Sequence, residues 1–209
     1  GSLVVLDCVT SVAGVAVELD EWGIDAAYSG TQKCLSCPPS LSPVSFSDRA
    51  LERVRERATP VQSWYLDVSL LAGYYEGAKR AYHHTAPISS IYGLSEGLKL
   101  VEEEGLAARE ARHREAAAAL IDGVAEFGFT PLVAAEHRLP MLTSLQLPEA
   151  ILSSGEAELR GALLNKHNIE VGAGLGSLAG KIWRVGLMGE NARITSVDRL
   201  VGALREELS

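Results

Sequence analysis

The sequence predicts an α/β fold that ends in a smaller α+β domain. Two short apolar runs, residues 3–6 and 24–28, are typical of strands buried on both faces of a parallel sheet. Residues 106–208 then follow the order helix, strand, strand, helix, strand, strand, helix, which is an α+β layer pattern. With 209 residues, 47% of them apolar, the chain can bury one large core or two small ones. We therefore expect one domain over residues 1–100 and a second over 101–209.

The first half alternates short apolar strands with small, polar loops. Ser47 is a good N-cap for a helix, because its hydroxyl can accept a hydrogen bond from a free backbone N–H, and Asp48 then lies near the positive end of that helix. Ile91, Leu94 and Leu98 recur at helical spacing. The elements expected in order are a strand at 3–6, a loop at 10–17, a helix or turn at 18–23, a strand at 24–28, a loop at 29–33, a turn at 38–42, a strand at 44–46, helices at 48–57, 68–75 and 89–104, and a loop at 79–87 between the last two.

The second half begins where Gly105 interrupts the helical pattern. Glu156 and Glu158 early in one helical segment, and Lys166 late in it, suit the dipole of a helix. The elements expected here are helices at 106–127, 154–166 and 196–208, and strands at 130–133, 142–147, 169–171 and 182–187.

The composition argues against several classes of protein. The net charge of -8 does not suit a protein that follows a nucleic-acid backbone. No apolar stretch approaches the roughly 18 residues of a membrane span. Cys34 and Cys37 form a CxxC pair, but a zinc site needs further ligands at matching spacing, and Pro38 stands where a redox pair would open a helix. We expect buried or partly buried thiols and no metal site.

Lys33 lies in a loop of small polar residues that follows a predicted strand. Open α/β sheets bind ligands at the carboxyl ends of their strands. Ser29, Gly30 and Thr31 could offer hydroxyl and N–H donors to a phosphate, and a deprotonated lysine amine can attack an aldehyde carbon. The alternative is an ordinary solvated lysine.

Two charged residues belong to apolar strands: Asp7 lies at the end of the first, and Arg184 lies within the strand predicted at 182–187. An unpaired carboxylate at the end of a buried strand is costly, and a pyridinium nitrogen would satisfy Asp7 and stay protonated beside it. The alternative is an aspartate that caps the next turn. The guanidinium of Arg184 can hold a carboxylate with two parallel bonds, unless it lies on the exposed face of an edge strand.

The segments around these residues resemble the class V aminotransferases, which use pyridoxal 5'-phosphate. The resemblance lies in VVLDCVTSVAG around Asp7, in GIDAAYSGTQKCLSCPPSLSPVSFS around Lys33, in Tyr-His-His-Thr at 82–85 and in KIWRVGLMG at 181–189. It covers essentially the whole chain and is strongest toward the alanine–glyoxylate (serine–pyruvate) branch. It implies that residues 1–100 are the C-terminal portion of the large domain of a fold-type I transferase, with a mixed, mostly parallel sheet, and that residues 101–209 are the small domain.

The resemblance implies a cofactor contact for each of four residues near the start of the chain. Lys33 would bind the cofactor covalently through its amine and then move the α-proton of the substrate. Asp7 would pair with the pyridine nitrogen, and Val9 would pack on the ring. Gln32 would contact the phosphate or the ring hydroxyl.

The resemblance also implies contacts to the substrate and to a second subunit. Arg184 would bind the substrate carboxylate. Tyr82 and Thr85 would reach the cofactor phosphate of the neighbouring subunit, which implies a homodimer with shared active sites. His83 and His84 would be structural, hydrogen-bonded residues, since Lys33 already supplies the acid–base group.

The reaction that this resemblance implies is transamination of alanine or serine with glyoxylate or a similar 2-oxo acid, giving glycine and pyruvate or hydroxypyruvate. Another class V reaction, such as phosphonate transamination or desulfuration, is one alternative. A desulfurase needs a mobile cysteine, however, and Cys34 and Cys37 are too close to Lys33 in sequence for that role. The other alternative is a truncated, non-catalytic homologue that dimerises or regulates.

Full-length members of the family carry a long N-terminal part that this chain does not show. That part supplies a glycine-bearing phosphate loop, the aromatic ring stacked on the cofactor and several strands. We expect such a portion to be absent through an incomplete gene sequence, separate encoding or natural shortening. The resemblance implies a soluble intracellular protein, cytoplasmic, peroxisomal or mitochondrial, and the C-terminal Glu-Leu-Ser is not a peroxisomal tripeptide.

Overall fold

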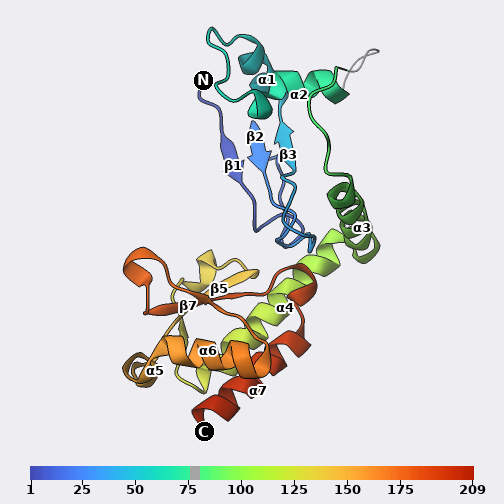
Figure 1. Ribbon diagram of the computed structural model, residues 1–209. Helices are drawn as coiled ribbons and strands as arrows, with labels where there is room; N and C mark the ends of the chain where they lie inside the picture. The colour runs from blue at the N-terminus through green and yellow to red at the C-terminus, as the bar shows by residue number, and fades with distance from the viewer. Residues whose placement is uncertain (76–80) are drawn as a thin grey trace.

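The computed structural model describes residues 1–75 and 81–209, so part of the loop predicted at 79–87 lies outside the described residues. The described chain forms two lobes, each with its own small sheet, and the helices α3 and α4 run between them (Figure 1). The upper lobe holds the N-terminus and the lower lobe the C-terminus. None of the helices in the described ranges is both long and apolar enough to cross a bilayer.

The upper sheet is mixed and has the strand order β1-β2-β3. Strands β1 and β2 are parallel, with Asp7 opposite Tyr28, while β2 and β3 are antiparallel. The predicted cap at Ser47 is confirmed, because the Ala50 backbone N–H donates to Ser47 Oγ at 3.2 Å. The elements of this lobe are β1 Val5–Asp7, β2 Ala26–Tyr28, β3 Val44–Phe46, α1 Asp48–Arg55, η1 Trp64–Leu66 and α2 Val68–Tyr75.

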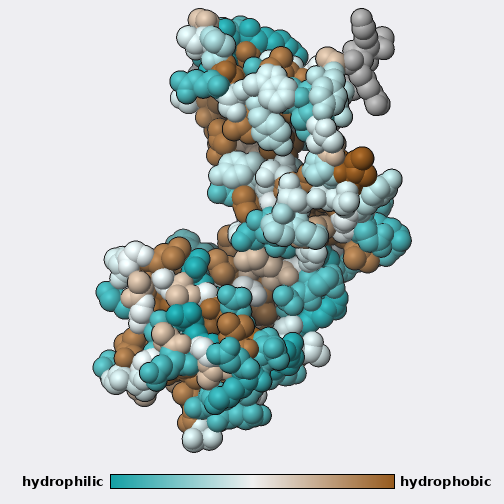
Figure 2. Space-filling model, viewed as in Figure 1, coloured by the Kyte–Doolittle hydropathy of each residue, from teal (hydrophilic) through white to brown (hydrophobic). Residues whose placement is uncertain are grey.

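Strand β1 is exposed, so the prediction that the first apolar run is buried on both faces is wrong. Val4 and Val5 are 48% and 64% exposed. The cause is the position of β1 at the edge of the sheet, where it pairs with β2 alone. Apolar side chains accordingly lie on the surface of the upper lobe (Figure 2). The buried carboxylate of this lobe is Asp25, which accepts from the Val4 N–H and Ser47 Oγ and forms an ion pair with Arg49.

The lower lobe is an antiparallel sheet of order β4-β5-β7-β6 with helices packed against it. Gly105, at a φ of 81°, separates the two helices that join the lobes. The elements are α3 Ile88–Glu104, α4 Leu106–Ala125, β4 Thr130–Pro131, η2 Ala135–His137, β5 Leu142–Gln146, α5 Glu149–Ser154, α6 Glu156–His167, β6 Gly172–Ala173, η3 Gly176–Leu178, β7 Ile182–Gly186, η4 Gly189–Asn191 and α7 Ile194–Leu208.

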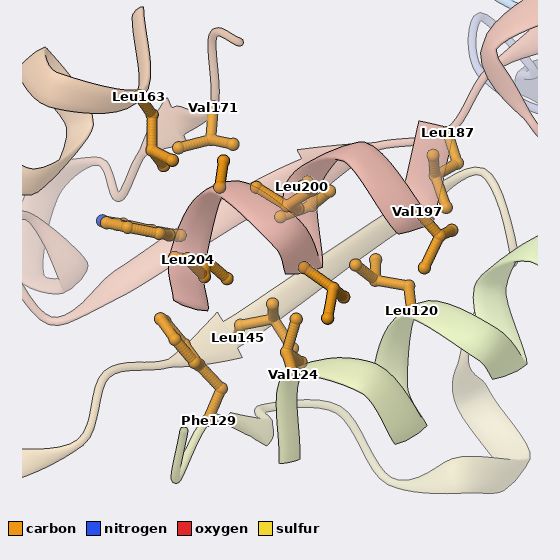
Figure 3. Close-up of a cluster of buried hydrophobic side chains, with 14 of the residues drawn as sticks. Leu120, Val124, Phe129, Leu145, Leu163, Val171, Leu187, Val197, Leu200 and Leu204 are labelled. Atoms are coloured by element: carbon orange, nitrogen blue, oxygen red, sulfur yellow. The ribbon is translucent and has the colours of Figure 1, made fainter. Parts of the chain in front are cut away.

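The main core lies between this sheet and the helices α4 and α7 (Figure 3). Leu120 of α4, Leu204 of α7 and Trp183 of β7 are each at most 1% exposed. Gly123 allows the two helices to approach, since a Cβ there would lie 2.8 Å from Val201 Cγ2. Each fully buried side chain of this kind stabilises the fold by about 1.5–3 kcal/mol. The α+β arrangement predicted for the second half is confirmed.

Two elements of the lower lobe differ from the prediction. The helix expected at 154–166 is present as α6, Glu156–His167, but the sequence did not predict the short helix α5, Glu149–Ser154, that precedes it; Gly155, with a φ of 102°, separates the two. The strand expected at 169–171 is wrong, and the chain pairs as β6 directly after that segment, where Gly172 and Ala173 lie opposite Arg184 and Trp183. A short pair of small residues carries no period-2 pattern, so the sequence offers no sign of β6.

A second apolar cluster joins the two lobes. It combines residues that follow β1 and β2 with one residue of α3 and one that precedes β5; its buried members are Ala13, Cys34, Leu35, Cys37, Val101 and Met141. The division between residues 100 and 101 stays a prediction. It falls within the last turn of α3, which ends at Glu104.

Candidate functional site

Lys33 lies on the turn that follows β2, at the edge of the upper sheet where β1 and β2 both end. Because these strands are parallel, their carboxyl ends lie side by side. The side chain of Lys33 is partly buried, and its amine has no hydrogen bond or ion pair with the part of the chain that the structure describes. Lys33 therefore presents an amine without a hydrogen-bond or ion-pair partner among the described residues, here called uncommitted, at the carboxyl edge of the sheet.

Asp7 is exposed at the end of β1 and is not the unsatisfied carboxylate that the sequence suggested. The Val9 N–H donates to its Oδ1 at 3.0 Å, and the Tyr28 hydroxyl donates to its Oδ2 at 2.8 Å. These hydrogen bonds, first that from Val9 and then that from Tyr28, lower the pKa of Asp7 below its ordinary value. Asp7 is thus an ionised carboxylate held in place beside the end of β2.

The Lys33 turn lines one side of a cavity of about 430 Å³. It lies between that turn and the segment that follows β7, and its lining residues are Gln32, Lys33, Ser36, Cys37, Gly186, Met188, Glu190 and Asn191. Asp7 does not line this cavity and instead faces a separate one of about 280 Å³. A further cavity of about 440 Å³ lies between α4 and β5, and none of the predicted site residues lines it.

Arg184 lies on the face of β7 that turns away from the main core. Its neighbours Trp183 and Val185 are buried in that core. Side chains alternate along a strand, so Arg184 shares its face with Gly186, which lines the cavity at Lys33. Arg184 Nε donates to the carbonyl oxygen of Ala173 at 2.8 Å, and the remaining guanidinium N–H groups make no hydrogen bond within the described ranges.

Tyr82 and Thr85 lie together but apart from the cavity at Lys33. Their hydroxyl oxygens are 2.7 Å apart, and Tyr82 is 77% exposed. Both lie in the extended segment between α2 and α3, on the outside of the upper lobe (Figure 1). The chain thus holds the two hydroxyls as an exposed pair.

The hydrogen bonding predicted for His83 and His84 is confirmed. His83 is buried, its Nε2 lies 3.2 Å from the carbonyl oxygen of Trp64, and its Nδ1 lies 2.8 Å from Nδ1 of His84. The ring of His83 also stacks on Trp64 at 4.0 Å. The pair therefore holds η1 against the segment that carries Tyr82.

The hydroxyls of Ser29 and Thr31, which were expected to bind a phosphate, donate hydrogen bonds to backbone carbonyls of the protein instead. Ser29 Oγ donates to the carbonyl oxygen of Cys8 at 3.2 Å, and Thr31 Oγ1 donates to that of Pro38 at 2.8 Å. Their backbone N–H groups donate to carbonyls as well. This part of the prediction is wrong, because both residues are buried and satisfy the strand-to-turn connection instead.

The three cysteines are buried free thiols, as predicted for Cys34 and Cys37. Cys34 Sγ donates to the carbonyl oxygen of Thr10 at 3.2 Å, and burial raises the pKa of both thiols of the CxxC pair. Neutral, buried thiols of this kind are poor nucleophiles.

Sequence reasoning missed a cluster of charged residues behind the Lys33 turn. Arg109 and His113 of α4 are 1% and 0% exposed, although they lie in the polar-looking segment LAAREARHREAAAA. The only sequence signal is their spacing of four residues, which places them on one face of the helix.

The fold, with a lysine-bearing turn at the ends of two parallel strands, is that of the pyridoxal-phosphate-dependent aminotransferases. The profile of the family "Aminotransferase class-V" matches residues 1–195. The chain belongs to this family.

Relatives named for glyoxylate transamination resemble the chain throughout its length. It is 40% identical to the alanine–glyoxylate aminotransferase of Rattus norvegicus, with 99% of this chain and 50% of the relative covered. It is 37% identical to the (S)-ureidoglycine–glyoxylate transaminase of Bacillus subtilis, with 94% of this chain and 50% of the relative covered. The crystal structure of an alanine–glyoxylate aminotransferase from Nostoc sp. matches with a TM-score of 0.94 and 48% identity, over 100% of this chain and 54% of that one. The chain spans about half the length of the curated relatives it matches.

Family membership implies pyridoxal phosphate as cofactor, and the residues described fit part of such a site. The amine of Lys33 is uncommitted, and Asp7 is an ionised carboxylate at the end of the adjacent parallel strand. The hydroxyls of Ser29 and Thr31 are not free to hold the phosphate. The chain therefore offers an amine for the aldehyde and, facing a neighbouring cavity, a carboxylate for the ring nitrogen.

Proposed function

We propose that this chain forms the lysine-bearing part of an aminotransferase that transfers the amino group of alanine or serine to glyoxylate or a similar 2-oxo acid. The products are glycine and pyruvate or hydroxypyruvate. The observation that carries the proposal is the uncommitted amine of Lys33 at the carboxyl edge of the β1–β2 pair, with the ionised Asp7 on the neighbouring strand. The names of the relatives, which share glyoxylate as acceptor, support it.

Lys33 would act twice in this reaction. Its amine, as the nucleophile, would hold the cofactor covalently before the substrate arrives. Once released, the same amine would take the α-proton of the amino acid and return it to the cofactor carbon. The bound cofactor supplies an electron-withdrawing ring, and the ionised carboxylate of Asp7 would keep the ring nitrogen protonated.

Arg184 would bind the carboxylate of each substrate. Its Nε is held by the carbonyl of Ala173, so the side chain is oriented while other N–H groups stay available. A guanidinium in that state can grip a carboxylate with two parallel hydrogen bonds. The bonds would align the α-carbon toward the cavity that Lys33 and Gln32 line.

Contacts from four further residues to the cofactor belong to the proposal. Val9, in the turn that follows β1, would pack on the ring, and Gln32 would reach the phosphate or the ring hydroxyl. Tyr82 and Thr85 would serve the phosphate in a neighbouring subunit of a homodimer. Their exposed, mutually hydrogen-bonded hydroxyls support this assignment, since they are free to face a second copy.

A second amino donor is (S)-ureidoglycine. The relative from Bacillus subtilis that is named for it is 37% identical, and its structure matches with a TM-score of 0.93 over 99% of this chain. Desulfuration is disfavoured, because Cys34 and Cys37 are buried with raised pKa values.

The proposal is tested with the 209-residue chain and pyridoxal phosphate. We expect saturable binding with a visible absorption band, and, after borohydride reduction, a pyridoxyl group that mass spectrometry maps to Lys33. Lys33→Ala should lose the band, while Lys181→Ala, at an exposed position, should keep it. Turnover of alanine, serine and (S)-ureidoglycine with glyoxylate then identifies the donor. Absence of both binding and turnover in the 209-residue chain would instead support the non-catalytic alternative.

A further inference from the structure

Arg109 is a buried arginine whose guanidinium spans two loops and a helix end. Its side chain is 2% exposed. Nε donates to the carbonyl oxygen of Ala13 at 3.1 Å, and Nη2 donates to that of Cys34 at 2.8 Å. Nη1 donates to Glu104 Oε2 at 2.5 Å and to Glu190 Oε1 at 3.3 Å. Every nitrogen of the group is therefore used.

The two carbonyls that Arg109 binds lie in the loops that follow β1 and β2. Cys34 comes directly after Lys33, and Ala13 belongs to the turn that follows the strand of Asp7. A single side chain from α4 thus ties both candidate cofactor loops to the lower lobe. The packing is tight here, since a Cβ at Gly14 would lie 2.8 Å from Cys34 Sγ.

Both loops contain a residue in the left-handed backbone region. Ala13 has a φ of 63° and Ser36 a φ of 58°. A residue with a Cβ adopts this conformation only when its surroundings hold it there. Arg109 binds the carbonyl of Ala13 itself, and the Glu190 N–H donates to Ser36 Oγ at 2.9 Å. The cluster therefore holds the loops in a shape they would not keep alone.

The charge of Arg109 is balanced within the same cluster. Glu104 accepts from Arg109 and also from Arg112, whose Nε lies 2.6 Å from Oε1. The two arginines lower the pKa of Glu104 to about 2, Arg112 being the larger cause. A buried charge of this kind persists only where its partners satisfy it. Arg112 differs from Arg109 in one respect, because its backbone contacts are to Gly189 and Ala192 and not to the Lys33 loop.

We propose that Arg109 is a positioning residue for Lys33, because it holds the Lys33 turn and the loop after β1 in the relative arrangement that chemistry at Lys33 needs. The inference rests on the proposed function of Lys33. A lysine at position 109 would keep the charge, but its three N–H donors share a single nitrogen, whereas Arg109 reaches the Ala13 carbonyl, the Cys34 carbonyl and Glu104 from three separate nitrogens. The guanidinium shape, and not the charge alone, is what the two loops require.

The test compares Arg109→Lys with the unchanged chain by hydrogen–deuterium exchange and by reaction of Lys33. The protected amides of the turn are those of Ser36 and Cys37, which donate to the carbonyls of Lys33 and Thr31. We expect their exchange to rise about tenfold or more in Arg109→Lys, because an opening that the guanidinium prevents becomes accessible. Amides of β5 and β7 should keep their rates. Labelling of Lys33 by pyridoxal phosphate and borohydride should slow by a similar factor.

Arg160→Lys is the matched control. Arg160 is likewise paired with a glutamate, Glu156 of the same helix, but its side chain is 28% exposed and it lies in α6, away from the Lys33 turn. We expect this variant to lose thermal stability without changing exchange at Ser36 and Cys37. Unchanged exchange at these two amides in Arg109→Lys, or a rise spread equally over β5 and β7, would overturn the proposal. If exchange changes as expected but Lys33 of the unchanged chain does not react, the proposed function fails while the positioning role stands.

A second measurement covers the case in which Arg109→Lys does not fold. In the unchanged chain, hydrogen exchange is followed at the Arg109 Nε–H and at the amides of Ser36 and Cys37 in mild denaturant. We expect one opening to expose all three groups, so their exchange rates should depend on denaturant concentration in the same way. Separate openings with different dependences would show that Arg109 does not hold the turn, and would overturn the proposal.

Discussion

His113 Nε2 accepts a hydrogen bond from the backbone N–H of Gly189 at 2.9 Å. The other ring nitrogen, Nδ1, donates to the carbonyl oxygen of Arg109 at 2.7 Å. A ring that donates at one nitrogen and accepts at the other is neutral. The contact joins α4 to η4, whose residues line the cavity at Lys33. Gly189 itself tolerates no side chain, since a Cβ would lie 1.9 Å from Ser36 Oγ.

The neutral state of His113 predicts a loss of stability on mild acidification. Burial is the main cause that lowers its pKa from the ordinary 6.5. Below pH 6.5 the unfolded chain therefore binds a proton that the folded chain does not, so the free energy of unfolding falls as the pH decreases toward the lowered pKa. Chemical denaturation at a series of pH values from 7.5 downward measures this for the unchanged chain and for His113→Gln. The free energy of unfolding should depend less steeply on pH in His113→Gln, but not in the exposed control His137→Gln. Equal pH dependences in all three proteins would contradict the prediction.

A second acid-sensitive contribution comes from Glu104. Its pKa is lowered from 4.5 to about 2, first by the hydrogen bond from Arg112. The stabilisation is fully present above pH 4.5 and is lost as the pH falls from there toward about 2, where the folded carboxylate takes up its proton. Glu104→Gln should remove most of that pH dependence and lower stability at neutral pH. Glu126→Gln, an exposed partner of Arg205, is the control, and the idea is lost if both variants behave alike.

Arg184→Gln should weaken substrate binding while leaving the fold and the cofactor site in place. A charged hydrogen-bonded pair contributes about 1.5–3 kcal/mol, so kcat/KM for the amino acid should fall by roughly 10- to 100-fold. Steady-state kinetics with alanine and glyoxylate checks this, alongside a titration with pyridoxal phosphate that should be unchanged. Arg205→Gln, whose side chain is 63% exposed, serves as the control. Loss of cofactor binding in Arg184→Gln would show that the side chain does something other than bind substrate.

Leu120→Ala should destabilise the lower lobe strongly. Leu120 is 0% exposed in the core between α4, α7 and the sheet. Removing a buried leucine side chain costs about 2–5 kcal/mol, because it loses burial and leaves a cavity. Leu164→Ala, at a position 46% exposed on α6, should change stability by no more than about 0.5 kcal/mol. Urea unfolding measures the free energy of unfolding of both variants. Similar decreases in the two would mean that the core lies elsewhere.

Local patterns were enough to predict many of the elements. The bounds expected for β3 and α2 agree with the structure, and the ends of α3 and α4 differ by one or two residues. These elements follow from apolar spacing and from caps such as Ser47, which act over a few residues. The burial predicted for β1 was wrong because burial is not a local property. A run of apolar residues shows that a strand is suited to burial, whereas the number of neighbouring strands determines whether it is buried.

Lys33 and Arg184 became candidate site residues because of their places beside and within predicted strands and because the motifs around them resemble those of the family; both motifs are local features of the sequence. The burial of Arg109 and His113 was not recognisable, since it depends on Ala13, Cys34 and Gly189, which lie 75 to 96 residues away along the chain. A charged residue on a helix is usually solvated, and only folding brings the carbonyls that satisfy it. The sequence therefore indicated candidate groups for chemistry, whereas long-range contacts decided which buried groups bind the loops around them.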